Sequence, residues 1–330
     1  MTQFKTVYIR RGEPEMRDAF IAGAPPNCQV VILDPNSTDE EFIEQVRDAD
    51  FLVCSRTGHP KGRFPDQMIR EATRLKLILS LGQGTDQVPM RIALERGIPV
   101  VNSGGANAIA VAEHAVLLML AVMRRLLPSV ETIRKGKFRT DLGLESNYFH
   151  QLYEKTVGIV GLGSIGQRVA KMVRGFDAKV IFTEKSEAPL SIVTDLQARR
   201  VNLEELLSSA DIISLHVPLL ESTRRMIGWK QLTMMKPSAI LINTSRGDVV
   251  DEEALIRALR EKKIVGAGLD VFEQEPTSLD NPLLSMDNVV ATPHTGGVAS
   301  ENLAPRIKIV WDNVLRVWEG KEPHNIVSSF

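Results

Sequence analysis

The residues 156–166 constrain the fold of this chain more than any other stretch. They read T-V-G-I-V-G-L-G-S-I-G, a short apolar run that enters a glycine-rich turn. Gly161, Gly163 and Gly166 have the G-x-G-x-x-G spacing of a strand that turns into a helix and lets the backbone approach a pyrophosphate. The alternative, a tight turn without a ligand, is disfavoured by the residues that follow. The stretch therefore predicts a dinucleotide-binding turn.

The residues after the turn complete this pattern. A helical stretch runs to about Gly175, an apolar strand covers 179–183, and the acid Glu184 ends it. The N-terminus of a helix attracts phosphates because its first N–H groups are unpaired and its dipole is positive there. A carboxylate at Glu184 would accept hydrogen bonds from a ribose diol and repel a 2′-phosphate. We expect NAD as the cofactor, with NADP less favoured but left open by Lys185.

Strand and helix patterns alternate on both sides of the turn. Apolar runs of strand length, separated by helical patterns with short connections, predict parallel sheets covered by helices. The expected strands are 30–33, 51–54, 77–81, 99–101, 157–160, 179–183, 212–216, 239–243, 265–270 and 289–292. The expected helices are 39–48, 65–74, 87–96, 104–135, 203–209, 251–261 and an amphipathic stretch within 297–320. The fold class is therefore α/β, with two Rossmann-like or flavodoxin-like domains.

The glycine turn lies in the middle of the 330 residues, and not near the start. A chain of this length is expected to form two domains. We expect an NAD-binding domain, residues 103–295, that is inserted into a discontinuous substrate domain formed by 1–102 and 296–330. The two crossings would be the helix after residue 103 and the junction near residue 295.

Composition narrows the function class. The net charge is −1, which gives no indication of a nucleic-acid or membrane surface. The N-terminus lacks the apolar core of a signal peptide, and the uncharged run 115–123 is too short to span a bilayer. Cys28 and Cys54 have no metal-ligand spacing, so we expect no metal site. Few cysteines suit a reducing cytoplasm, where we expect this protein.

Three chemically capable residues each follow an expected strand of the C-terminal half. Arg246, Glu275 and His294 would meet beyond the carboxyl ends of these strands, where open parallel sheets bind ligands. Arginine matches a carboxylate, histidine moves a proton near neutral pH, and a carboxylate can hold the other ring nitrogen. Each alone is typical of a surface or loop residue, but their joint placement predicts reduction of a 2-keto acid. Arg246 would anchor the carboxylate, and His294, paired with Glu275, would act as the general acid/base.

The chain resembles the D-isomer-specific 2-hydroxyacid dehydrogenase family over nearly its full length. The motifs that carry the resemblance are GLGSIG at 161–166, HVPL at 216–219, NTSRGDVVDEEAL at 243–255, GLDVFE at 268–273 and TPH at 292–294, with SLGQGTD at 80–86 and VAEH at 111–114. The resemblance implies an NAD(H)-dependent oxidoreductase that interconverts a D-2-hydroxy acid and its 2-keto acid. It implies the same catalytic trio and a homodimer joined through the cofactor domain.

The resemblance also implies a full set of binding residues, some of which pattern alone does not assign. Those for the cofactor are Gly161, Gly163, Ser164, Ile165, Gly166, Glu184, Val217, Pro218, Thr244, Ser245, Asp270 and Gly296. Among them, Ser164 and Ile165 would meet the pyrophosphate, Val217 and Pro218 the adenosine, and Asp270 with the Thr244 region the nicotinamide carboxamide. The substrate would contact Leu81, Gly82, Gln83, Arg246 and His294. Gln83 replaces a residue that is usually small or apolar, which points to an atypical substrate.

Several readings stay open at the level of sequence. One is an NAD(H)-sensing, corepressor-like binding protein on the same fold. Another is an enzyme acting on formate or phosphite, although Glu275 stands where formate-type members carry glutamine, which disfavours formate. The particular 2-hydroxy acid is not indicated. Arg56 either meets a phosphate or second carboxylate of the substrate or lies on the surface.

Overall fold

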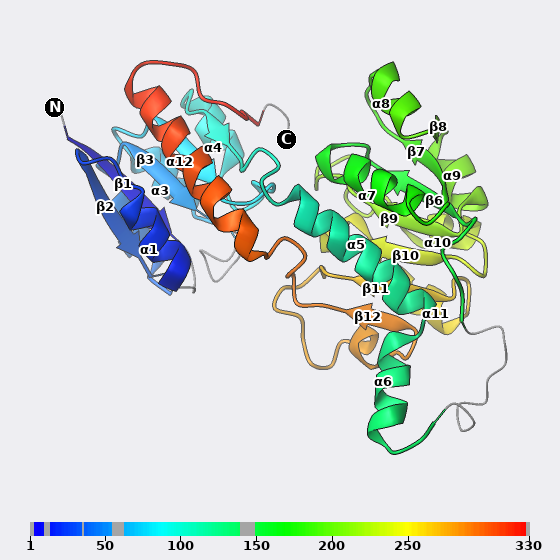
Figure 1. The fold of residues 1–330 in the computed structure, drawn as a ribbon. Helices are drawn as coiled ribbons and strands as arrows, with labels where there is room; N and C mark the ends of the chain where they lie inside the picture. The colour runs from blue at the N-terminus through cyan, green and yellow to red at the C-terminus, as the bar shows by residue number, and fades with distance from the viewer. Residues whose placement is uncertain (1–2, 10–13, 35, 55–62, 139–148, 328–330) are drawn as a thin grey trace. The chain divides into compact units, whose positions relative to one another are not determined.

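The structure is a computed structural model that describes residues 3–9, 14–34, 36–54, 63–138 and 149–327 (Figure 1). The chain divides into two compact units, one formed by Met1–Asn107 with Ala299–Phe330 and one by Ala108–Val298. The expected domain boundaries lie a few residues from these limits. Arg56 lies outside the described residues.

The first unit is built on a five-stranded parallel sheet with the order β2-β1-β3-β4-β5. This is the strand order of flavodoxin-like folds. Its strands are β1 (Phe4–Ile9), β2 (Cys28–Leu33), β3 (Phe51–Cys54), β4 (Leu77–Ser80) and β5 (Val100–Val101). The three central strands, β1, β3 and β4, are almost continuously buried because helices cover both faces of the sheet.

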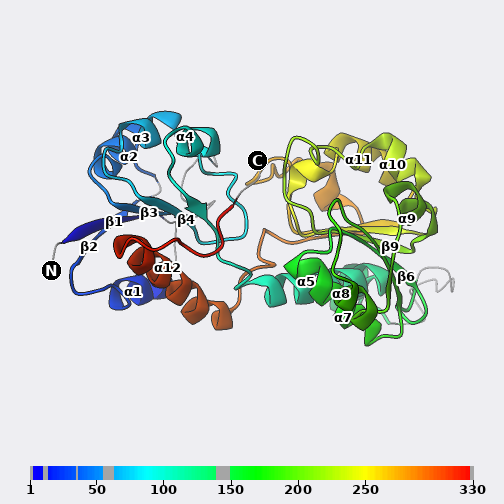
Figure 2. The ribbon, with the colours of Figure 1, turned by 90° about the horizontal axis from the view of Figure 1, so that it is seen from above.

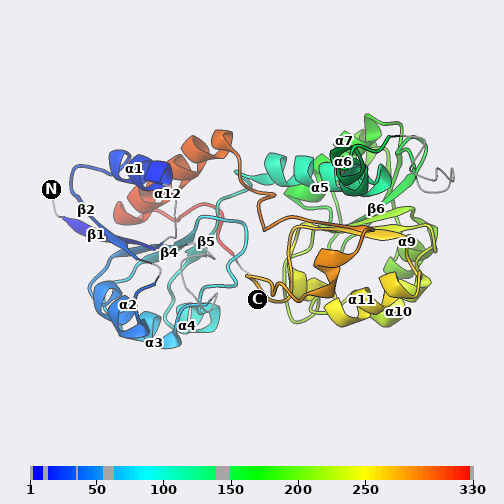
Figure 3. The same cartoon turned by 90° about the horizontal axis from the view of Figure 1, so that it is seen from below.

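Figure 3 shows how these helices divide between the two faces. One face carries α2 (Asp39–Val46), α3 (Asp66–Glu71) and α4 (Met90–Glu95), and the other carries α1 (Pro14–Ala22) and α12 (Leu303–Trp318). The C-terminal helix α12 joins a core from the opposite end of the chain. Its Trp311 ring lies 4.6 Å from that of Phe20 and donates a hydrogen bond to the Phe20 carbonyl oxygen at 3.1 Å. This contact explains why the first unit is discontinuous in sequence.

The second unit holds a seven-stranded parallel sheet with the order β12-β11-β10-β9-β6-β7-β8. Its strands are β6 (Thr156–Val160), β7 (Lys179–Thr183), β8 (Ala198–Arg200), β9 (Ile212–Leu215), β10 (Ile240–Asn243), β11 (Gly266–Leu269) and β12 (Val289–Ala291). From β6 the chain proceeds outward through β7 and β8, then returns to the other side of β6 with β9. The strand order therefore reverses beside β6, which is where ligands bind in such sheets.

Helices cover both faces of this sheet as well (Figure 2). On one side lie α5 (Ala108–Met123) and α7 (Ser164–Arg174), and on the other α9 (Leu203–Ser209), α10 (Trp229–Met234) and α11 (Glu252–Arg260). Beyond these are α8 (Leu190–Asp195), α6 (Leu126–Arg134) and the short 3-10 turns η4 (Gly247–Val249) and η5 (Pro282–Ser285). A third 3-10 turn, η6 (Ser300–Asn302), belongs to the first unit and directly precedes α12. Two parallel, helix-covered sheets confirm the expected α/β class.

The structure corrects the expected elements in several places, and the sequence analysis did not predict β1, α1, α8 or α10. The single helix expected over 104–135 is two helices, because Arg125 takes a left-handed backbone conformation (φ 46°) between α5 and α6. Strand β8 was not predicted. It has only three residues, two of them exposed arginines, so it lacks the apolar alternation that marks a strand.

Candidate active site

The three glycines of the nucleotide turn differ in what surrounds them. A Cβ at Gly161, whose φ is +94°, would lie 2.8 Å from the His216 carbonyl oxygen, and one at Gly166 would lie 2.1 Å from the Gly161 carbonyl oxygen. These two glycines are required by the packing of the turn itself. Gly163 has an ordinary φ of −72°, and a Cβ there would meet nothing within 4 Å. The space beside Gly163 is thus open to a group from outside the chain.

Helix α7 starts at Ser164, directly after this open position. No side chain caps its N-terminus. The first N–H groups of a helix need acceptors, and a phosphate supplies them. An open glycine followed by an uncapped helix fits the pyrophosphate of a dinucleotide, with Ser164 and Ile165 at the contact.

Glu184 lies against the same turn. Its Oε2 accepts a hydrogen bond from the Leu162 amide at 2.8 Å, and its Oε1 accepts one from the Lys185 amide at 2.8 Å. A carboxylate has further lone pairs, so these bonds leave it able to accept from a ribose hydroxyl. The two amides fix the acid where the adenosine ribose of a dinucleotide would lie.

A residue that the sequence analysis missed, Arg200, lies beside Glu184. Its Nη2 donates to the carbonyl oxygens of Glu184 at 2.7 Å and of Ser186 at 3.1 Å. Strand β8 brings it there by pairing with β7. Because β8 gives no strand pattern, sequence spacing alone did not place an arginine at this turn.

The segment after β9 lies against the glycine turn. Val217 is close to it, since its Cγ1 would lie 3.0 Å from a Cβ on Gly161, and Pro218 follows. The preceding His216 has its Nε2 2.9 Å from the Ser214 Oγ, and burial lowers the pKa of His216 to about 3. This histidine therefore stays neutral at physiological pH and is unsuited to donate a proton there.

Arg246 sits in a turn that Asn243 holds together at the end of β10. The Asn243 amide donates to the Arg246 carbonyl oxygen at 2.9 Å, and its Oδ1 accepts from the Ser245 amide at 3.0 Å and the Ser245 Oγ at 2.8 Å. A Cβ at Gly247 would lie 1.9 Å from the Phe272 carbonyl carbon. The lack of a side chain at Gly247 thus allows the turn of Arg246 to lie against the segment that leads to Glu275.

Glu275 and His294 form a hydrogen-bonded pair. His294 Nδ1 lies 2.7 Å from Glu275 Oε2, and the other carboxylate oxygen, Oε1, accepts from the Phe272 amide at 3.1 Å. The side chain of Glu275 is 17% exposed, and that of His294 is 36% exposed. An ionised carboxylate only accepts, so His294 carries a proton on Nδ1 and keeps Nε2 for proton exchange with a substrate.

Two polar residues at the same edge of the sheet, Thr244 and Asp270, are those expected to bind a nicotinamide carboxamide. The hydroxyl of Thr244, which follows β10, is buried without a hydrogen-bond partner among the described residues. It therefore fits an external polar group. The carboxylate of Asp270, in contrast, already accepts from the Thr292 hydroxyl at 2.7 Å, the Thr295 amide at 2.9 Å and the Gly296 amide at 2.8 Å.

Asp270 is ionised despite its burial. Desolvation raises the pKa of a buried carboxyl, but hydrogen bonds from His114, Thr292 and the amides of Gly296 and Thr295 hold the pKa of Asp270 below its usual value. The residue is 2% exposed. A fixed negative charge thus lies under the loop that carries His294.

Residues 82–84 of the first unit have their carbonyl acceptors satisfied and their amide donors open, whereas the Leu81 amide donates to the Cys54 carbonyl oxygen at 2.9 Å. The carbonyl oxygens of Gly82, Gln83 and Gly84 accept, in turn, from the Ser103 amide at 3.1 Å, the Asn102 Nδ2 at 3.1 Å and the Ser80 Oγ at 2.6 Å. Within the described residues, the amides of Gly82, Gln83 and Gly84 have no acceptor. Consecutive open amides of this kind suit an anion such as a carboxylate.

The described part of the chain has neither a metal-binding cluster nor a membrane-spanning helix. It holds no group of three or more histidine, cysteine or acidic residues that could bind a metal ion. None of its helices combines the length and apolar character needed to cross a bilayer. The expected cytoplasmic location stays a prediction from cysteine usage.

Comparison with known proteins decides the family. The D-isomer-specific 2-hydroxyacid dehydrogenase family, in its NAD-binding domain, matches residues 116–296. A glyoxylate reductase of Korarchaeum cryptofilum is 36% identical over 305 residues, which cover 92% of this chain and 87% of that protein. The chain belongs to the D-isomer-specific 2-hydroxyacid dehydrogenase family. This confirms the expected enzyme class, an oxidoreductase acting on CH–OH groups, and the use of NAD(P).

Two further members of the family indicate how widely its members differ. A D-3-phosphoglycerate dehydrogenase of Methanocaldococcus jannaschii is 39% identical over 294 residues, which cover 88% of this chain but 54% of that protein. The structure of D-mandelate dehydrogenase from Rhodotorula graminis superposes with a TM-score of 0.87 at 27% identity, covering 100% of this chain and 99% of that one. Proteins similar to this chain are thus named for different substrates, so membership of the family does not identify the substrate.

Proposed function

We propose that this protein is an NAD(H)-dependent reductase of 2-keto acids that forms D-2-hydroxy acids. The observation that carries the proposal is the 2.7 Å contact between His294 Nδ1 and Glu275 Oε2, at the edge of the sheet that also bears the open glycine turn. This contact leaves His294 Nε2 to exchange a proton with a substrate oxygen. Arg246, which follows β10 and is thus separated from the end of β12 by β11, supplies the cation that a 2-keto acid requires.

Residues of this chain have separate roles in the reduction. NADH, when bound, supplies the hydride that substrate C2 receives. His294 gives the proton from Nε2 to the carbonyl oxygen, which becomes the hydroxyl, and Glu275 stabilises the imidazolium before this transfer. Arg246 anchors the carboxylate and polarises the carbonyl. Oxidation follows the reverse path, with His294 accepting the proton.

For the cofactor, we propose a preference for NAD(H) over NADP(H). The Glu184 carboxylate is fixed by the Leu162 and Lys185 amides, and a 2′-phosphate beside it would meet a like charge. Arg200 and Lys185 bring positive charge to the same turn and reduce this repulsion. We therefore expect a preference in kcat/KM and not a complete exclusion of NADPH.

A cofactor-oxidation screen tests the activity and the preference together. NADH and NADPH are each offered with glyoxylate, hydroxypyruvate, pyruvate and larger 2-keto acids, and glyoxylate is the first choice because of the name of the Korarchaeum relative. We expect turnover with NADH favoured, and the chiral products should have the D configuration. L products would contradict the proposal. Tight NADH binding without turnover of any keto acid would favour the NAD(H)-sensing binding protein instead.

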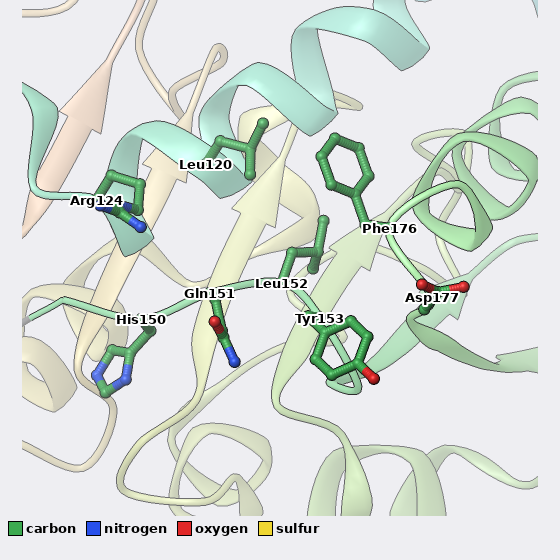
Figure 4. A pocket seen from close by; sticks show the side chains of 8 residues that line it. All are labelled: Leu120, Arg124, His150, Gln151, Leu152, Tyr153, Phe176 and Asp177. Carbon is green, nitrogen blue, oxygen red and sulfur yellow. The ribbon is translucent and has the colours of Figure 1, made fainter.

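We also propose that the protein forms a homodimer through its second unit. Helix α6 buries none of its own residues, and it exposes Leu126, Leu127 and Ile133 by 44%, 48% and 52%. The same unit has a mainly apolar hollow of about 490 Å³ (Figure 4). It is lined by Leu120, Arg124, His150, Gln151, Leu152, Tyr153, Phe176 and Asp177. Exposed apolar side chains on a helix and an apolar hollow indicate surfaces that a second copy would cover.

A further inference from the structure

The loop that carries His294 is tied to helix α5 by a chain of polar contacts that the proposed mechanism does not use. His114, on α5, has its Nε2 2.8 Å from the Thr292 Oγ1 and 3.4 Å from the Asp270 Oδ1. Thr292 Oγ1 in turn lies 2.7 Å from Asp270 Oδ1. The side chains of His114 and Asp270 are 15% and 3% exposed, so solvent competes little for these contacts.

The available protons fix which group donates in each hydrogen bond between His114, Thr292 and Asp270. The Asp270 carboxylate is ionised and only accepts, so the single hydroxyl proton of Thr292 points to it. The Thr292 oxygen can then only accept from His114. It follows that His114 carries its proton on Nε2, and the order is His114 to Thr292 to Asp270.

Asp270, the last acceptor in this series of hydrogen bonds, also holds the loop that carries His294. Asp270 accepts the amide of Thr295 on Oδ1 and the amide of Gly296 on Oδ2, and its carbonyl oxygen accepts the His294 amide at 2.9 Å. His294 has a left-handed backbone (φ 55°), which is unfavourable for a residue with a side chain. The bonds to Asp270 on both sides of His294 are what hold this conformation.

We propose that His114 is a positioning residue for proton transfer by His294. Its N–H restrains the Thr292 hydroxyl, which keeps the Asp270 carboxylate in the orientation that holds the loop and aims His294 at the substrate. The proposal rests on the proposed role of His294. It differs from simple packing of His114 in the helix, because it requires a hydrogen-bond donor at Nε2 and an effect transmitted through Thr292.

Kinetics of matched variants test this inference. In His114→Leu we expect kcat to fall about tenfold while the KM for NADH stays within about twofold, since the nucleotide turn is untouched. His114→Gln, which retains an N–H donor of similar reach, should recover most of kcat. Thr292→Val should lower kcat to a similar extent, and the double variant should be no slower than the slower single variant. Additive losses, or equal losses in His114→Gln and His114→Leu, would overturn the proposal.

A second measurement does not depend on turnover and separates this inference from the proposed function. Nitrogen NMR of histidine-labelled protein should show His114 protonated on Nε2, and Thr292→Val should change the His294 resonances. An Nε2 without a proton, or unchanged His294 signals, would reject the positioning role even where the wild type reduces keto acids. Loss of activity in His294→Ala together with full activity in both His114→Leu and Thr292→Val would reject the positioning role alone.

Discussion

At the scale of single residues, the glycine turn contains two glycines that the fold needs and one, Gly163, that has open space beside it. Gly166 cannot carry a Cβ without a contact of 2.1 Å to the Gly161 carbonyl oxygen, whereas Gly163 has open space and an ordinary φ. The same G-x-G-x-x-G spacing thus contains two kinds of constraint. Alanine substitution can distinguish them because it adds only the Cβ.

Gly163→Ala should weaken NADH binding about tenfold or more while leaving the unfolding temperature unchanged or slightly raised, because its backbone angles suit alanine. Gly166→Ala is the matched control, and we expect it to lose roughly 1–3 kcal/mol of stability through the forced contact. Fluorescence titration with NADH and thermal unfolding measure the two effects. Normal NADH affinity in folded Gly163→Ala would show that no cofactor group approaches there.

The residues of the candidate site differ in how far the sequence could indicate them. Arg246, Glu275 and His294 were identifiable because each follows an apolar strand, and parallel strands end at one edge. His114 was not, because its contact with Thr292 spans 178 positions along the chain. Only the packing of α5 against β10, β11 and β12 brings the two together.

At the scale of elements, the sequence predicted most of the buried strands, such as β6 and β9 to β11, because they are mainly apolar. It did not predict β1, although this strand is almost continuously buried. It did not predict short elements with weak patterns, such as β8, α8 and α10. The break between α5 and α6 was also missed. It depends on a left-handed residue, Arg125, that is not one of the types that normally adopt this conformation.

Helix α6 offers a test of the proposed dimer. Leu127→Glu with Ile133→Glu places charges on exposed apolar positions, so the fold should persist while the dimer weakens at least about tenfold. Leu190→Glu on α8, where the leucine is 80% exposed, is the matched control and should keep the oligomeric state of the wild type. Sedimentation velocity reports both. A wild type that stays monomeric at micromolar concentration would contradict the proposed dimer.

At the scale of the whole molecule, the chain distributes its chemistry over two units. The second unit contains the open glycine turn, the fixed Glu184 and the pair formed by Glu275 and His294. The first unit contains residues 82–84, whose amides have no acceptor among the described residues. The position of the glycine turn in mid-chain indicated the insertion, and the contact of α12 with the N-terminal sheet explains it. The identity of the substrate depends on side-chain detail that the strand pattern does not encode.

The most direct test of the whole account is the effect of His294→Ala on the reduction step. General acid–base catalysis by a positioned side chain typically contributes ~10²–10⁴-fold, so we expect kcat to fall by about that factor. The dissociation constant for NADH should stay within about twofold of the wild-type value, because the substitution leaves the glycine turn unchanged. Single-turnover kinetics with a saturating keto acid measure the step itself. A folded His294→Ala protein that reduces the keto acid at the wild-type rate would contradict the central claim that His294, held by Glu275, delivers the proton.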